Sequence, residues 1–136
     1  MQSREFLKPA QTLANELTEA DWRGSAVHTY YALFLECRDA WARWGCLPPG
    51  RFNVHAAARL KLVYAKDADL KQIGSVLERL GTLRTQASYD MTTQQQFSSS
   101  NNVRQAITSA LAALALLDAI EADPQRRTAA IASLPP

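Results

Sequence analysis

The sequence has little of what sheet-rich, disulfide-bonded or membrane-spanning proteins require. Only five glycines occur in 136 residues, and β-branched runs are rare, so a sheet-rich fold is disfavoured. The two cysteines, Cys37 and Cys46, lack the paired spacing of zinc and redox sites. We therefore expect reduced thiols, no bound metal and no cofactor.

Strong charge and long apolar runs are also lacking. The net charge of +2 is too small to indicate nucleic-acid binding by bulk electrostatics, so a local basic patch would be needed. Residues 1–5 have no apolar signal core, and no run approaches the roughly 20 apolar residues of a membrane span. We therefore expect a cytoplasmic protein that does not enter a membrane.

The apolar residues that are present recur at helical spacing. The expected helices span residues 5–18, 22–44, 53–66, from Asp67 or Asp69 to about 86, 101–122 and 124–133. Residues 87–100 are polar and without period, which predicts a loop. The sequence thus predicts one all-α domain over residues 1–136, an antiparallel bundle of four to five main helices with a short C-terminal helix.

Residues at the ends of these segments have the chemistry of helix boundaries. Asp21, Asn53 and Ser100 or Asn101 are expected to accept hydrogen bonds from free backbone N–H groups at helix starts. Gly45 is expected to end the second helix, and Pro124 suits a first helical turn.

Two segments resemble the HEPN (higher eukaryotes and prokaryotes nucleotide-binding) domain. Residues 23–34, RGSAVHTYYALF, are similar to the R-S-A-x-S-R-A-Y-Y-A-x-F pattern on the long central helix of that family. Residues 83–90, LRTQASYD, are similar to the L-R-x-x-A-D-Y-D segment of many prokaryotic members. The two segments occur in the family's order, and the resemblance covers roughly residues 10–122.

The resemblance implies a compact helical bundle, usually a homodimer. Active members are metal-independent ribonucleases, often toxins, while others bind nucleotides or act beside a small nucleotidyltransferase in toxin–antitoxin or defence systems. The ribonucleases use an R-x4-6-H motif around the second segment. Here Arg84 matches the arginine, but no histidine follows it, and Ser88 replaces the usual acidic residue. We therefore favour a binding module over an enzyme.

Four residues are the candidates for a nucleotide- or RNA-binding site. Arg84 has the charge and shape to contact phosphate, and Tyr89 can stack on a base or donate to phosphate. Asp90 follows in the same segment, where capping or a salt bridge is the alternative role. His28 occupies the place of the basic residue before the family's tyrosine pair. For Arg84 the alternative is a contact with the C-terminal helix dipole.

A second match to the ribonuclease motif lies inside the central helix. Arg23 and His28 satisfy R-x4-H, but five helical residues place the two side chains about 140° apart. We therefore expect this match to be coincidental. Two other hypotheses remain: a ribonuclease toxin of degenerate sequence, and a protein-interaction bundle that uses Trp41 and Trp44 as an exposed patch.

Overall fold

The structure, a computed structural model, describes residues 1–46, 54–92 and 94–135, with the backbone alone for 54–58 and 94. The helices are η1 (Ser3–Phe6), α1 (Leu7–Ala14), α2 (Glu19–Arg43), α3 (Val54–Val63), α4 (Ala68–Tyr89), η2 (Gln94–Phe97), α5 (Asn101–Ala122) and α6 (Pro124–Ala132). No strand occurs in these ranges. The all-α prediction is therefore confirmed.

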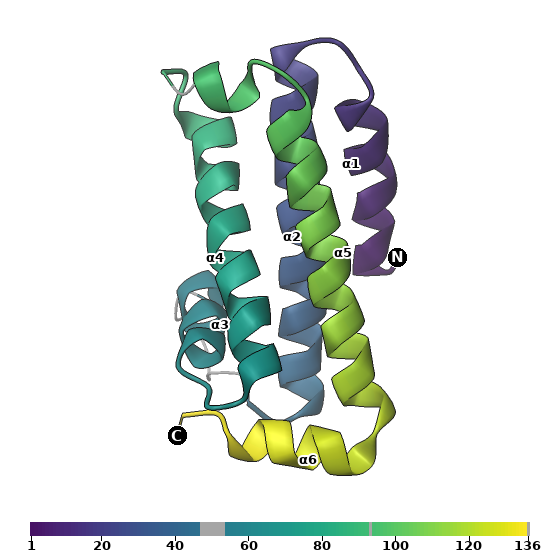
Figure 1. Ribbon diagram of the computed structural model, residues 1–136, viewed down its shortest axis with the longest axis vertical. Helices are drawn as coiled ribbons and strands as arrows, with labels where there is room; N and C mark the ends of the chain where they lie inside the picture. Colours follow the sequence, from purple (N-terminus) through teal and green to yellow (C-terminus); the bar gives the residue numbers. More distant parts are fainter. Residues whose placement is uncertain (47–53, 93, 136) are drawn as a thin grey trace.

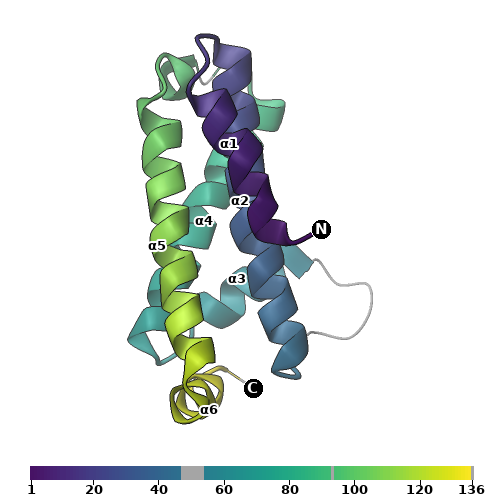
Figure 2. The same ribbon diagram turned by 90° about the vertical axis from the view of Figure 1, so that its right-hand side faces the viewer.

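The long helix α2 is the central member of the bundle. It packs against α1, α4 and α5, and it lies between α4 and α1 in Figure 1, with α1 in front of it in Figure 2. Its inner side chains are buried because apolar residues recur every three or four positions. Tyr30, Leu33, Phe34 and Trp41 each have no more than 4% of their surface exposed. Removing this apolar surface from water is the main stabilising contribution to the fold.

The start of α2 differs from the prediction. Thr18, not Asp21, is the N-cap residue, and its hydroxyl accepts from the backbone N–H of Asp21. The preceding helix stops at Ala14 instead of residue 18, and Leu17 is 87% exposed. The chain therefore turns between Ala14 and Thr18, and the Thr18 cap begins a new helix.

Several predicted boundaries are confirmed. Asp67 caps α4 by accepting from the N–H of Leu70, and Pro124 is in the first turn of α6 behind the capping residue Asp123. Gly45 follows α2 with a φ of +70°, which an L side chain rarely adopts. The predicted cap Asn53 lies outside the described residues.

The segment predicted as a loop is partly helical. α4 continues to Tyr89, and η2 forms before α5 begins. Ser100 occupies the N-cap position of α5 as expected, but its side chain makes no capping hydrogen bond, and the hydroxyl of Ser99 accepts from the N–H of Asn101. The α4 extension places Arg84 one full turn before the helix end, which removes the expected contact with the helix dipole.

The predicted tryptophan patch is wrong. Trp41 is fully buried, and Trp44 stacks on it with ring centroids 5.5 Å apart. Trp44, the C-cap residue of α2, is partly buried and packs against the same core. The protein-interaction hypothesis thereby loses the surface on which it rested.

The helix α5 has the length and mean hydropathy of a membrane-crossing segment. Its inner side chains, among them Val103, Ile107, Leu114 and Leu117, are buried in the bundle. A buried core helix of a globular protein meets the same two criteria.

Candidate functional site

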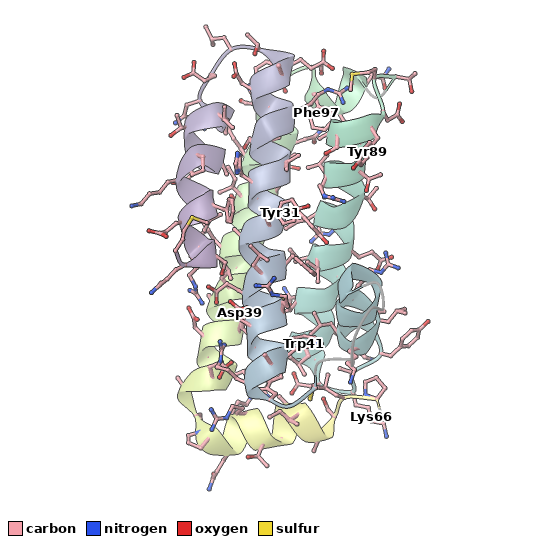
Figure 3. The ribbon with its side chains drawn as sticks, turned by 180° about the vertical axis from the view of Figure 1, so that it is seen from behind. Tyr31, Asp39, Trp41, Lys66, Tyr89 and Phe97 are labelled. Carbon is pink, nitrogen blue, oxygen red and sulfur yellow. The ribbon has the colours of Figure 1, made fainter. Side chains whose placement is uncertain are left out.

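The tyrosine pair of α2 contributes one buried ring, Tyr30, and one partly buried ring, Tyr31. Tyr30 stacks on Phe34 with centroids 5.6 Å apart, and it meets the ring of Tyr31 edge-on at 5.2 Å. Burial raises the pKa of Tyr30 to about 12, although the charge of Arg84 acts in the opposite direction. Tyr31 reaches the seam between α2 and α4 (Figure 3).

Arg84 comes from α4 and lies against this tyrosine pair. Its Nη2 donates to the hydroxyl of Tyr31 over 3.0 Å, and its Cζ lies 5.4 Å from the centroid of each tyrosine ring. Rings attract a guanidinium placed over their faces. No carboxylate in the described ranges forms an ion pair with Arg84, and its Nε is buried without a hydrogen-bond partner.

His28 extends the same surface towards the N-terminus. Its ring stacks on Phe6 with centroids 5.7 Å apart, and Phe6 is 6.5 Å from Tyr31. Phe6, His28, Tyr31 and Arg84 therefore form one continuous surface across η1, α2 and α4, which we call the tyrosine face. The structure thus brings two of the four predicted residues, His28 and Arg84, to the same face.

Tyr89 and Asp90 are not part of the tyrosine face. Tyr89 is the last residue of α4 and is 75% exposed, near the end of the bundle (Figure 3). Five helical residues separate it from Arg84, so the two side chains point about 140° apart. The Asp90 carboxylate accepts from the N–H and hydroxyl of Thr92, and these bonds lower the pKa of Asp90. These bonds of Asp90 therefore hold the turn after α4, and they are neither the helix cap nor the salt bridge that was expected as the alternative role.

Arg23 holds the end of α4 in place. Only 8% of the residue is exposed, and its Nη1 donates to the carbonyl oxygens of Gln86, Ala87 and Asp90 over 2.9, 3.2 and 3.0 Å. These acceptors lie at the helix end, where backbone carbonyls lack partners within the helix.

The other atoms of Arg23 are also engaged. Its Nε and Nη2 donate to Glu19, and its Cζ lies 4.6 Å from the centroid of Phe97. Arg23 and His28 therefore face different neighbours, which agrees with a coincidental R-x4-H match. The sequence did not predict a structural role for Arg23, because no pattern in the residues around it indicates that α4 ends beside it.

The sequence also did not predict the groove between α4 and α5. A groove of about 490 Å³ lies between α4 and α5, and carboxamide side chains from α4, η2 and α5 line it, including Gln86, Gln96, Asn102 and Gln105. In sequence these residues are spread over helix surfaces and a polar segment, and no motif joins them. Its lining includes none of the four predicted site residues.

Comparison with known protein families, with characterised proteins and with solved structures finds no match to this chain. The HEPN resemblance therefore stays a prediction. The described ranges contain no group of three or more His, Cys, Asp or Glu side chains that could hold a metal ion.

Proposed function

We propose that the protein is a nucleotide- or RNA-binding module that receives phosphate at Arg84 on the tyrosine face. The observation that carries this proposal is the bonding of Arg84 itself. Its only hydrogen bond to a described residue goes to the phenol of Tyr31, and no described residue offers an acceptor to its buried Nε. Leaving such a donor unsatisfied costs about 1–3 kcal/mol, so stability alone does not account for this arginine.

A bound anion would accept hydrogen bonds from the guanidinium nitrogens of Arg84 that have no acceptor among the described residues. The Nη1 of Arg84 makes no hydrogen bond to a described side chain, and the guanidinium fork matches the spacing of two phosphate oxygens. The aromatic contacts orient the fork before a ligand arrives, which lowers the conformational entropy lost on binding.

The rings beside Arg84 suit the rest of a nucleotide. Phe6, His28 and Tyr31 lie in sequence along the tyrosine face, and stacking of a base on such rings contributes about 1–3 kcal/mol. This arrangement favours single-stranded RNA or a free nucleotide over a duplex, whose bases are already stacked. The exposed Tyr89 lies beyond this face and is not required by the proposal.

The wider assignment follows from the resemblance alone. We propose a HEPN-like domain that acts as a homodimer beside a nucleotidyltransferase partner, in a toxin–antitoxin or defence system of the cytoplasm. Sedimentation equilibrium tests the dimer. A single species at the monomer mass of 15.0 kDa, at about 100 μM protein, would remove it.

Amide shifts of the ¹⁵N-labelled chain test the ligand class. Titration with AMP, ATP and a single-stranded octanucleotide should shift amides around Tyr31 and Arg84, and Arg84→Ala should abolish these shifts. Arg38→Ala is the control, because Arg38 is exposed on α2 and already pairs with Asp39. Shifts confined to other helices, or none at about 5 mM nucleotide, would overturn the assignment.

One observation favours a ribonuclease as the second candidate. His28 and Arg84 share the tyrosine face, and metal-independent cleavage of RNA needs a proton-transfer group and a cation near the phosphate. Incubation of the chain with total RNA in EDTA is the test. Cleavage that disappears in both His28→Ala and Arg84→Ala supports this candidate, and intact RNA at about 10 μM protein rejects it.

A further inference from the structure

The groove between α4 and α5 has a polar rim over an apolar floor. The two long helices, which pack side by side, form its walls, and Gln96 of η2 lines the end near the start of α5. The floor consists of Val76, Leu80, Leu83 and Ala106. A concave site with an apolar base and a few convergent polar groups is the usual form of a ligand site.

Two carboxamides on the rim are free. The side chains of Gln86 and Gln105 make no hydrogen bond to any described residue. Asn102, in contrast, donates to the carbonyl oxygen and Oε1 of Gln96, over 2.9 and 3.1 Å, and so ties η2 to the start of α5. This end of the groove is therefore preformed, while its wall offers amide groups that both donate and accept.

The charges of the groove lining, and the kinds of side chain in its described part, indicate which ligands the groove can bind. Arg79 and Glu78 contribute opposite charges to the rim, so the groove provides no net attraction for a polyanion. Among the described residues of the lining there is no aromatic side chain on which a base or a sugar ring would stack. An uncharged ligand with its own amide groups fits better.

The length of the groove matches a short extended chain. Its α4 wall runs from Ser75 to Gln86, which at 1.5 Å per residue is about 17 Å. An extended peptide spans this length with about five residues. We propose that the groove binds an extended, uncharged peptide segment of a partner protein. The peptide backbone pairs with Gln86 and Gln105, and alternate apolar side chains rest on the floor.

Two blocked peptides of different length test this site on the intact chain. The pentapeptide acetyl-SVSVS-amide should shift amides of residues 75–86 and 102–109, with an affinity at least five-fold higher than that of the trimer acetyl-SVS-amide. Replacing both Gln86 and Gln105 by Ala should weaken pentapeptide binding at least five-fold. The exposed Gln125→Ala on α6 is the matched control and should bind as the parent does.

Three results would overturn the proposal. One is the absence of shifts at about 5 mM pentapeptide, and another is equal affinity for the two lengths. The third is a shift of these same amides by maltotriose or by an oligonucleotide but not by the peptide. Circular dichroism of the double variant should match that of the parent, because Gln105 is exposed and Gln86 is only partly buried. Arg84→Ala should leave peptide binding unchanged, which separates this site from the tyrosine face.

Discussion

Arg84 donates to the hydroxyl of Tyr31, 3.0 Å away, and this phenol is its one hydrogen-bond partner among the described residues. Arg23, on α2, shows the opposite condition, since all three of its guanidinium nitrogens have acceptors. Both arginines lie over aromatic rings, but only Arg23 donates hydrogen bonds from all of its guanidinium nitrogens to described residues. This contrast separates a structural arginine from a candidate binding one.

Arg23→Ala should destabilise the protein by about 2–4 kcal/mol. The substitution removes the donor for three carbonyl oxygens at the end of α4 and leaves space beside Phe97. Urea unfolding followed by circular dichroism measures the change. Arg38→Ala, at an exposed pair, should change the unfolding free energy by less than about 0.5 kcal/mol. Equal effects of the two substitutions would contradict the anchoring role of Arg23.

Gly74 and Gly81 should respond to alanine with opposite signs. A Cβ at Gly74 would lie 2.7 Å from the Cβ of Leu62 and 2.9 Å from the backbone N of Val63, so α3 must move away. We expect Gly74→Ala to cost about 1–3 kcal/mol. At Gly81 the nearest atom is 3.5 Å away on Tyr30, and alanine should stabilise α4 by up to about 1 kcal/mol. Thermal melts of both variants provide the comparison.

Arg126 should stabilise the fold at neutral pH and lose this effect in acid. Its hydrogen bonds to Asp67, together with the N–H of Leu70, lower the pKa of that carboxyl below its ordinary value of 3.8. A lowered folded-state pKa gives stability that is present above the ordinary value and is lost as pH falls through the folded one. Arg126→Ala should therefore cost about 1 kcal/mol near pH 7.

The loss should shrink between pH 7 and pH 2, because Asp67 gains a proton as the pH falls towards its lowered folded-state pKa. Urea midpoints at the two pH values measure this difference. The control is Arg127→Ala, at a more exposed pair with Glu121 whose atoms are 3.8 Å apart, and its effect should be smaller at both pH values. A cost for Arg126→Ala that does not change with pH would contradict the role of the Asp67 pair.

Tyr31→Phe should weaken phosphate binding without unfolding the protein. The ring and its contacts remain, but Arg84 loses the hydroxyl that orients its fork. We expect affinity for a single-stranded oligonucleotide to fall about two- to ten-fold, less than for loss of the arginine itself. Fluorescence anisotropy measures this affinity. The control is Tyr64→Phe, at an exposed tyrosine, which should bind with the affinity of the parent. Unchanged affinity in Tyr31→Phe would show that Arg84 is positioned by other contacts.

The helical architecture could be predicted because the spacing of apolar residues is visible in the sequence without knowledge of the tertiary structure. Apolar residues at intervals of three and four define α2, α4 and α5 independently of their neighbours. Boundaries were less predictable, since Thr18 and Asp21 are both good capping residues. The choice between them depends on where the chain turns after Ala14.

The site was predictable only in part. Arg84 and His28 were selected from a resemblance, and their meeting across Tyr31 depends on how η1 and α4 pack beside α2. Tyr89 was selected from the same resemblance, but the direction of its side chain depends on the extra turn of α4. The α4–α5 groove could not be predicted, because its lining comes from segments that are far apart in the chain.

Affinity for a fluorescein-labelled single-stranded octanucleotide, compared among the parent, Arg84→Lys and Arg84→Ala, tests the central claim most directly. A lysine keeps the charge but loses the two-pronged geometry, so we expect a loss of about three- to ten-fold for lysine and more than ten-fold for alanine. Circular dichroism should confirm that all three chains are folded. Equal dissociation constants for the parent and Arg84→Ala, with folding intact, would contradict a phosphate site at Arg84.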